Sequence, residues 1–276
     1  MTMLNVAIVG VGAWGMNHVR NFADLEDAHL YACCDLNEFR LQKIKKMYPQ
    51  TKITQRFNDI ISDANIDAVV IAVSAAVHFP LAKGALMAGK HVFIEKPMTL
   101  RIEEAAELVQ LSEAYGLTLM VGHLMEYHPA VEELKKLVST GELGEIYYLY
   151  SQRVNLGQIR RDENALWSFA PHDISILLYL IEEDPTDVST RGESYLQDGI
   201  HDVVFVNPRF PGKKMANIQL SWLDPHKIRK LTIVGSKKMA VFDDTENTEK
   251  IRIYDKRVIL TDIEQLSKPK RCFILF

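Results

Sequence analysis

The sequence places glycines and an acidic residue where they could bind a dinucleotide. The motif Gly-Val-Gly-Ala-Trp-Gly at residues 10–15 follows an apolar run, precedes a helical segment, and is followed by a second apolar run that ends at Asp35. This order of strand, glycine turn, helix, strand and acid is the fingerprint of a dinucleotide-binding fold. The first glycine allows a tight turn, the second lets a pyrophosphate approach the backbone, and the third lets the helix pack closely on the strand. The alternative is a tight turn without a ligand. We predict that the cofactor is bound by Gly10, Gly12, Ala13, Trp14, Gly15 and Asp35.

Asp35 also bears on the choice between NAD and NADP. A carboxylate at the end of the second strand can accept hydrogen bonds from both ribose hydroxyls, and it repels a 2′-phosphate. Arg40 lies about one helical turn further on and would soften this preference, although an arginine there is more often a solvated helix residue. The sequence therefore favours NAD over NADP.

A lysine follows another apolar run, over residues 91–95, in the sequence Glu95-Lys96-Pro97. Ligands of parallel sheets bind beyond the C-terminal ends of the strands, so this lysine is expected to face cofactor and substrate. Its ammonium group can hydrogen-bond a substrate hydroxyl and assist its deprotonation. The alternative is an ordinary solvated lysine. Lys96-Pro97 is also a candidate cis peptide bond. The same edge of the sheet adds three further candidates for cofactor binding, namely Ser74, His78 and Glu95.

A histidine in the second half of the chain is the other candidate for proton transfer. Pro171 suits the first turn of a helix expected over residues 171–180, which puts His172 near the helix start. There the helix dipole disfavours the imidazolium and keeps the ring a competent base. Asp173 is expected to cap the helix or orient the ring, and Tyr127 to line the cleft. The alternative for His172 is a capping or core histidine.

The elements that would position these residues are indicated by hydrophobic periodicity. Residues 1–122 alternate short apolar runs with helical segments, and a continuous run such as residues 67–73 is typical of a strand covered on both faces. Residues 123–276 contain two helices, over 129–139 and 171–180, among runs that read as strands. In residues 216–222 apolar and polar side chains alternate, as in an open sheet. The predicted fold class is α/β: an N-terminal Rossmann domain with a doubly wound parallel sheet, then a C-terminal α+β domain on a large open, mainly antiparallel sheet.

Composition limits the functional classes. The chain has 276 residues, 47% hydrophobic and 25% charged, which is typical of a globular protein. Its net charge of -4 indicates neither a nucleic-acid surface nor a membrane patch. Three cysteines, of which Cys33 and Cys34 are adjacent, give neither a disulfide framework nor the spacing of a metal site, and we expect that pair to be buried in a strand. The N-terminal run lacks a basic leader, so a cytoplasmic location is expected.

The glycine turn, the Glu95-Lys96-Pro97 motif and a histidine opening a helix in a following α+β domain together resemble the Gfo/Idh/MocA oxidoreductases over nearly the whole chain. The resemblance implies NAD(P)-dependent oxidation or reduction of a secondary alcohol on a sugar or cyclitol. It implies that Lys96 and His172 are the catalytic pair, in one cleft, without deciding which is the formal base. It also implies a substrate-binding second domain whose open sheet mediates a homodimer or homotetramer.

A narrower resemblance points to the branch that oxidises nucleotide sugars at the 3-position, such as UDP-N-acetylglucosamine 3-dehydrogenases. It rests on residues 155–157, 160–161, 165–167 and 170–173. Arginines can bind a diphosphate or a sugar carboxylate. Solvated loop arginines are the alternative. The substrate-binding residues are predicted to be Lys96, Tyr127, Arg153, Asn155, Arg160, His172 and Asp173, with Arg161 a further source of charge.

Two departures from the family pattern stand out. Many members have an acid four residues before the histidine, where this chain has Ser168, and the tail over residues 267–276 shows no clear amphipathic helix. The hypothesis is that the last element of the second domain is truncated or altered. Two rival functions remain: a dehydrogenase of a free sugar or cyclitol, and a dinucleotide-binding protein without catalytic activity.

Overall fold

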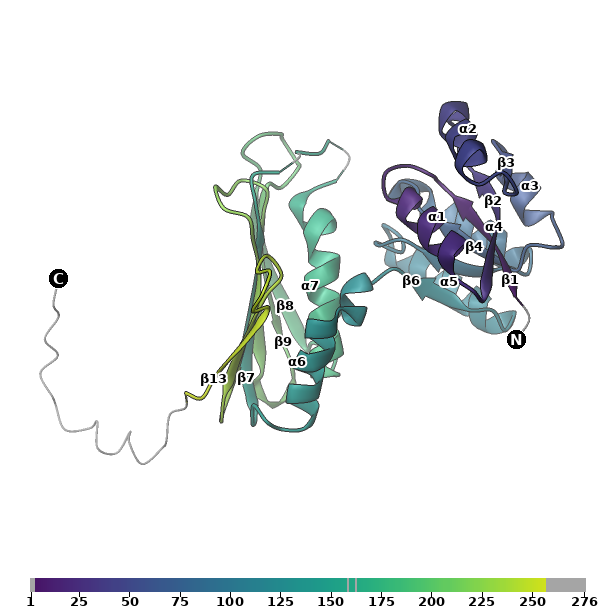
Figure 1. Cartoon of the computed structure of the whole chain (residues 1–276). Coiled ribbons are helices and arrows are strands. Elements are labelled where there is room, and N and C mark those ends of the chain that lie inside the picture. Colours follow the sequence, from purple (N-terminus) through teal and green to yellow (C-terminus); the bar gives the residue numbers. More distant parts are fainter. Residues whose placement is uncertain (1–2, 158, 162, 257–276) are drawn as a thin grey trace, which may run out of the picture. The chain divides into compact units, whose positions relative to one another are not determined.

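The computed structural model describes residues 3–157, 159–161 and 163–256. The chain divides into two compact units, Met1–His123 and Leu124–Phe276, each with its own sheet and hydrophobic core (Figure 1). The tail over residues 267–276, to which the truncation hypothesis refers, lies outside the described residues. Among the helices of the described ranges, none has the length and apolar composition required to cross a bilayer.

The N-terminal unit contains a six-stranded parallel sheet in the order β3-β2-β1-β4-β5-β6. The strand order reverses at β1, which lies between β2 and β4, and ligands of such sheets bind at this switch point. The elements are β1 (Leu4–Val9), α1 (Gly15–Asp24), β2 (Ala28–Cys34), α2 (Glu38–Met47), β3 (Lys52–Thr54), α3 (Phe57–Ile61), β4 (Ala68–Ile71), η1 (Ala75–Val77), α4 (His78–Met87), β5 (His91–Ile94), α5 (Ile102–Ala114) and β6 (Leu119–Val121).

Strand β1 shows why the apolar runs of this unit are continuous. Val6 and Ile8 pack in one buried cluster, whereas Ala7 and Val9 pack in another. Because side chains alternate along a strand, both faces of the sheet are covered, and the predicted doubly wound sheet is confirmed. The adjacent cysteines end β2 inside this core, where burial raises the pKa of Cys33 to about 12 and that of Cys34 to about 11.

The C-terminal unit contains a seven-stranded sheet in the order β13-β12-β11-β7-β10-β9-β8, antiparallel except between β7 and β10. The predicted open, mainly antiparallel sheet is thus confirmed. The elements are η2 (Leu124–Tyr127), α6 (Pro129–Ser139), β7 (Ile146–Val154), α7 (Ala165–Ile181), β8 (Asp187–Glu193), β9 (Val203–Arg209), η3 (Pro211–Lys213), β10 (Met215–Ser221), β11 (Ile228–Gly235), β12 (Met239–Asp243) and β13 (Ile251–Tyr254).

Helices α6 and α7 both lie on one face of this sheet (Figure 1). Alternation along β7 and β10 directs Leu149, Ile218 and Leu220 into the core beneath the helices. Two tyrosines of β7 point the other way: Tyr148 and Tyr150 are exposed, and their rings stack with centroids 6.2 Å apart. The sheet therefore presents one packed face and one face with exposed aromatic side chains.

Helix α7 differs from its sequence prediction. It begins at Ala165 rather than Pro171, and the Asn164 side chain caps it by accepting a hydrogen bond of 3.1 Å from Trp167 N. Pro171 therefore lies inside the helix, where it removes one backbone hydrogen bond. Buried residues on both sides of the proline, such as Ala165, Ala170 and Ile176, anchor the helix to the core. The prediction that His172 lies near a helix start, under the influence of its dipole, is wrong.

Strand β8 was missed because its sequence carries no hydrophobic signal. All seven residues from Asp187 to Glu193 are exposed, although the strand pairs with β9 along its whole length. It is an edge strand, and a polar sequence is a common way to protect such an edge from pairing with other chains.

Candidate active site

The glycine turn between β1 and α1 is tightly packed at two of its glycines. Gly10 has a φ of 90°, and a Cβ built on Gly15 would lie 1.8 Å from the Gly10 carbonyl oxygen, so larger side chains are excluded at both positions. At Gly12, by contrast, the nearest atom to such a Cβ would be Arg40 Nη1, at 3.7 Å. The backbone at Gly12 is therefore open to a close ligand, as a pyrophosphate requires. These residues fit a dinucleotide.

Asp35 follows β2 and is held against this turn. Its Oδ2 accepts a hydrogen bond from Val11 N at 2.9 Å, and its Oδ1 accepts one from Asn37 N at 2.8 Å. Arg40 Nη1 lies 3.5 Å from Oδ2. The carboxylate is thus fixed at the edge of the glycine turn, with a guanidinium beside it, which is the position expected for the acid that binds the adenosine ribose.

The turn that carries Lys96 is joined to the glycine turn through Glu95. Glu95 Oε1 accepts a hydrogen bond from Trp14 Nε1 at 2.5 Å, and His18 Nε2 lies 2.8 Å from the same oxygen. Burial raises the pKa of Glu95, but the hydrogen bonds from His18 and Trp14 outweigh it and hold the pKa below its usual range. The Lys96-Pro97 peptide bond is cis, as the sequence suggested.

The loop after β4 is held to the same turn by His78. Its Nδ1 lies 2.8 Å from the Pro97 carbonyl oxygen, and its Nε2 lies 3.2 Å from that of Val73. The ring is 1% exposed, so any effect of His78 on the cofactor acts through the placement of these two loops. Ser74 lies just before η1, where its carbonyl oxygen accepts a hydrogen bond from Val77 N at 3.0 Å.

In the C-terminal unit, His172 lies within α7 next to a buried ion pair. Asp173 Oδ2 accepts a hydrogen bond from Arg153 Nε at 2.5 Å, and Asp173 Oδ1 accepts one from the Ser151 hydroxyl. Arg153 and Ser151 come from β7, and all three residues are buried. The pair therefore ties α7 to the sheet at the position of His172. Asp173 does not cap the helix, since Asn164 does, and the charge of Arg153 is matched inside the protein.

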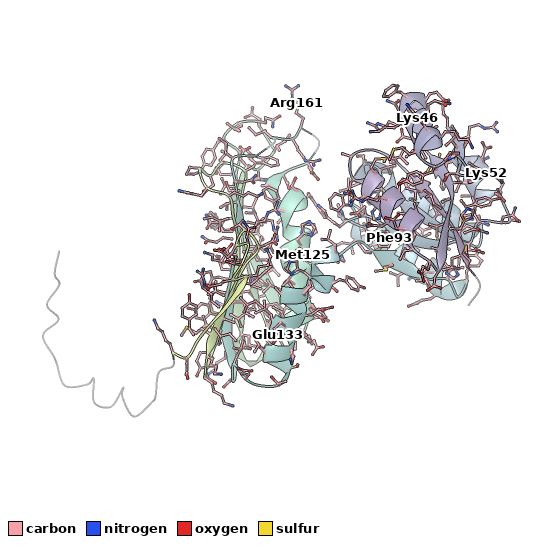
Figure 2. All side chains as sticks on the ribbon, in the orientation of Figure 1. Lys46, Lys52, Phe93, Met125, Glu133 and Arg161 are labelled. Atoms are coloured by element: carbon pink, nitrogen blue, oxygen red, sulfur yellow. The ribbon has the colours of Figure 1, made fainter. Side chains whose placement is uncertain are left out.

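The segment before α7 brings a second acid close to the helix. The Ser168 hydroxyl donates a hydrogen bond to Glu163 Oε1 at 2.7 Å, and Arg160 Nε lies 3.0 Å from the same oxygen. Ser168 and His172 are four residues apart and so share one face of α7. Arg161 is exposed at the tip of this loop (Figure 2).

The predicted site residues thus form two groups, one in each unit. The glycine turn, Asp35, Ser74, His78, Glu95 and Lys96 gather at the C-terminal ends of the parallel strands. The second unit holds the remaining ones: Tyr127 is exposed at the end of η2, and Asn155 follows β7 with its N–H bonded to Ser221 O at 3.0 Å. The expectation that Lys96 and His172 face one nicotinamide ring stays a prediction.

Three polar residues of these groups were not identified from the sequence: His18, Ser151 and Glu163. His18 lies on α1 one turn after Gly15, and a histidine at that distance from the glycine turn is the sequence feature that could have identified it. Ser151 lies on the same buried side of β7 as Leu149 and Arg153, because every second side chain of a strand points to one side. Two polar side chains on a buried side are expected to form hydrogen bonds within the protein. Glu163 carries no local signal, because its contact with Ser168 depends on the path of the loop.

The buried pair predicts a large effect on stability. Arg153→Leu leaves the Asp173 carboxylate buried without its partner, which should lower the free energy of unfolding by about 3 kcal/mol or more. The matched control is Arg252→Ala, which removes an exposed pair with Glu249 and should change it by no more than about 1 kcal/mol. Urea unfolding followed by circular dichroism measures both. Equal stability of Arg153→Leu and the unmodified chain would contradict a role of this pair in holding α7.

A cavity of about 270 Å³ also lies in the C-terminal unit, between α6, α7 and the sheet. It is lined by Val138, Glu145, Ile146, Leu149, Leu180, Ile181, Gly212, Lys214 and Ile233. None of the predicted site residues is among them, so the largely apolar cavity belongs to neither group of site residues.

Comparison with known proteins identifies relatives for both units. Residues 4–123 match the family model described as "Oxidoreductase family, NAD-binding Rossmann fold", and residues 131–241 match the GFO/IDH/MocA C-terminal domain. The chain is similar to myo-inositol 2-dehydrogenase of Thermotoga maritima, with 25% identity over 99% of this chain and 82% of the relative. It is equally similar to UDP-N-acetylglucosamine 3-dehydrogenase of Acidithiobacillus ferrooxidans, with 26% identity over 93% of this chain and 78% of the relative.

The solved structures agree with this assignment. A structure of UDP-N-acetylglucosamine 3-dehydrogenase from Acidithiobacillus ferrooxidans matches with a TM-score of 0.82 and 26% identity, covering 93% of this chain and 81% of that one. The two family models together span most of the chain, and the glycine turn and the Glu95-Lys96-Pro97 turn lie within the first of them. The chain belongs to the Gfo/Idh/MocA family of NAD-binding oxidoreductases.

Proposed function

We propose that this oxidoreductase transfers hydride to NAD from a secondary hydroxyl of a sugar, at C3 of a nucleotide sugar such as UDP-N-acetylglucosamine. The observation that carries the proposal is the contact of Glu95 with Trp14 and His18, which holds the Lys96 turn beside the glycine turn. A lysine in that place can reach a substrate oxygen next to a bound nicotinamide.

The proposed chemistry divides between two side chains. When NAD is bound, it supplies the hydride acceptor. The Lys96 ammonium group donates a hydrogen bond to the substrate oxygen and stabilises the negative charge that develops as its proton leaves. The His172 ring is proposed to take that proton, so that the C–H hydrogen departs as hydride and a ketone forms. Lys96 as the formal base is the alternative assignment.

Recognition of a nucleotide sugar is proposed to involve the loop before α7. Arg160 and Arg161 are both exposed there, and guanidinium groups bind diphosphate oxygens with charge-assisted hydrogen bonds. Asn155 and Tyr127 are proposed to contact the sugar. Arg153 and Asp173, being bonded to each other, are proposed to act on the substrate through the position of His172.

The second candidate is oxidation of a cyclitol, and the similarity to myo-inositol 2-dehydrogenase over 99% of this chain supports it. The test is NADH formation by the purified protein with UDP-N-acetylglucosamine, myo-inositol or glucose. NADH formation with the UDP-sugar alone would support the proposal. NADH formation with myo-inositol would instead favour oxidation of a cyclitol. Absence of turnover with all three, together with measurable NADH binding, would favour a dinucleotide-binding protein without catalytic activity.

The geometry around Asp35 also predicts the cofactor preference. We propose that NAD is preferred over NADP because the Asp35 carboxylate repels a 2′-phosphate. Asp35→Ser should shift the ratio of NADH to NADPH affinity toward NADPH by about tenfold or more, because juxtaposed like charges destabilise a complex by several kcal/mol. Adding Arg40→Ala to this variant should weaken NADPH binding again, because the guanidinium is then the remaining partner for the phosphate. Titration of cofactor fluorescence measures both. An unchanged ratio in Asp35→Ser would contradict the assignment of Asp35 to the ribose.

The exposed face of the C-terminal sheet is proposed to mediate a homodimer or homotetramer. Supporting this, Tyr148 and Tyr150 of β7 are exposed on this face, and aromatic side chains are enriched in protein interfaces.

A further inference from the structure

The Glu95 carboxylate receives hydrogen bonds from two different elements. Oε1 lies 2.5 Å from Trp14 Nε1, in the glycine turn, and 2.8 Å from His18 Nε2, on α1. Oε2 accepts a weaker hydrogen bond of 3.3 Å from the backbone N–H of Lys96 itself. Because an ionised carboxylate can only accept, His18 donates through Nε2. One carboxylate thus connects the start of α1 to the backbone of Lys96.

The surroundings of Glu95 leave it little room to move. The residue is 7% exposed, and a Cβ built on Gly122, just after β6, would lie 3.1 Å from Oε1. The His18 ring is itself fixed, since it packs edge-on against Phe93 of β5 with ring centroids 5.2 Å apart (Phe93 is labelled in Figure 2). Removal of the His18 donor would therefore allow the Glu95 carboxylate to move in one direction only, toward α1.

We infer that His18 is a positioning residue for Lys96, and that it acts by holding the Glu95 carboxylate and thereby the backbone of the turn that carries the ammonium group. The inference rests on the proposed function of Lys96, and it assigns His18 a role in placing that group rather than in touching the substrate. A misplacement of about 1 Å can lower a rate by about 100-fold, so a small shift of this turn matters.

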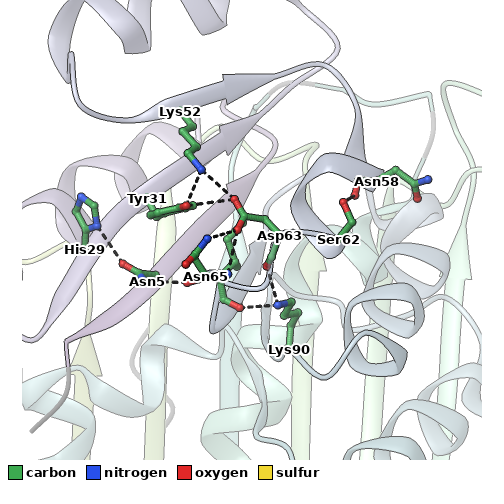
Figure 3. A network of polar contacts seen from close by, with 10 residues as sticks. Asn5, His29, Tyr31, Lys52, Asn58, Ser62, Asp63, Asn65 and Lys90 are labelled. Atoms are coloured by element: carbon green, nitrogen blue, oxygen red, sulfur yellow. Dashed lines mark hydrogen bonds and ion pairs between the residues drawn. The ribbon is translucent and has the colours of Figure 1, made fainter.

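The same unit offers a matched control at the other edge of its sheet. Near the N-terminal ends of the strands, His29 Nδ1 lies 3.1 Å from Asn5 Oδ1, within reach of a network that contains Lys52, Asp63 and Lys90 (Figure 3). Loss of the His29 side chain removes a histidine contact of similar length in the same unit. It should leave the Lys96 turn unchanged, because ligands bind at the opposite edge.

The experiment measures the surroundings of Lys96 without using activity. Lysines of the full chain are labelled with limiting acetic anhydride, with and without NAD, and the labelling rate of each is read by mass spectrometry. His18→Leu keeps the apolar contact with Phe93 but removes the donor, and it should change the rate at Lys96 while Lys52 and Lys90 stay as in the unmodified chain. His18→Gln, which retains a donor, should bring the labelling rate at Lys96 part of the way back to that of the unmodified chain. His29→Leu should leave the labelling rate at Lys96 unchanged.

A second variant tests the same link without altering any of the bonded side chains. Gly122→Ala presses a methyl group against the Glu95 carboxylate and should change Lys96 labelling as His18→Leu does. Unchanged labelling at Lys96 in folded His18→Leu would overturn the inference. If His18→Leu does not fold, unchanged labelling at Lys96 in both His18→Gln and Gly122→Ala would overturn it.

Kinetics separate this inference from the proposed function. If the unmodified chain oxidises a sugar, His18→Leu should lower kcat by about 10- to 100-fold while NADH affinity stays within about threefold. A loss of NADH affinity with unchanged kcat would instead assign His18 to cofactor binding and overturn the inference. If the unmodified chain oxidises none of the sugars, the proposed function fails, and the labelling result still decides whether His18 positions Lys96.

Discussion

Replacement of Lys96 by alanine is expected to lower kcat by about two to four orders of magnitude, the range typical of a lost proton-transfer or polarising group. The physical reason is that the Lys96 turn is joined through Glu95 to Trp14 in the glycine turn, which brings an ammonium group to the site where a nicotinamide is proposed to bind. The measurement is steady-state oxidation of UDP-N-acetylglucosamine, with NADH affinity determined in parallel by fluorescence.

The matched control for this variant is Lys52→Ala. Lys52 is paired with Asp63 at 3.0 Å in the same unit, but near the opposite edge of the strands (Figure 3). Its loss should leave kcat and NADH affinity unchanged. Near-normal turnover in Lys96→Ala would remove this lysine from the mechanism and leave its turn with a structural role only.

Replacement of His172 by alanine is expected to have an effect of similar size, a fall in kcat of about two to four orders of magnitude. His172 lies within α7, where Asp173 is bonded to Arg153 and Ser151 of β7, so its backbone is held firmly to the sheet. The control is His226→Ala, which removes an exposed histidine of the same unit that pairs with Asp224. A folded His172→Ala enzyme with normal turnover would contradict the proposed role.

The pH dependence of kcat/KM distinguishes the two assignments of the base. A histidine base must be neutral to accept a proton, so a histidine base predicts an acidic limb, in which activity falls as the imidazole becomes protonated. If His172 is the base, this acidic limb should be absent from the residual activity of His172→Ala and present in Lys96→Ala. Persistence of the limb in His172→Ala would assign the proton to another group.

The N-terminal unit and its cofactor residues could be predicted from sequence because their signals are local. Continuous apolar runs mark strands buried on both faces, and Gly10 and Gly15 are required by contacts within one turn. The role of Asp35 could be predicted from its distance along the chain from that turn. The open sheet of the second unit was likewise visible in the alternation along β10, where Ala216, Ile218 and Leu220 are buried.

The errors and omissions lie where structure depends on distant contacts. His18 and Glu95 are separated by 77 residues, and no local pattern marks their contact. The start of α7 was misplaced because a proline favours the first turn of a helix, whereas Asn164 supplies a cap earlier in the chain and buried residues carry the helix through Pro171. The Arg153–Asp173 pair shows the same limit, because a charged residue on a strand predicts a ligand or an ion pair equally well.

The central claim is that Lys96 and His172 act on one substrate hydroxyl, and a crystal structure of the protein with NAD and UDP-N-acetylglucosamine tests it most directly. The account predicts that Lys96 Nζ and a ring nitrogen of His172 both lie within about 2.6–3.2 Å of the same sugar oxygen, and that the carbon bearing this oxygen faces the nicotinamide. A complex in which NAD lies over the glycine turn but either side chain is remote from the sugar hydroxyl would contradict it.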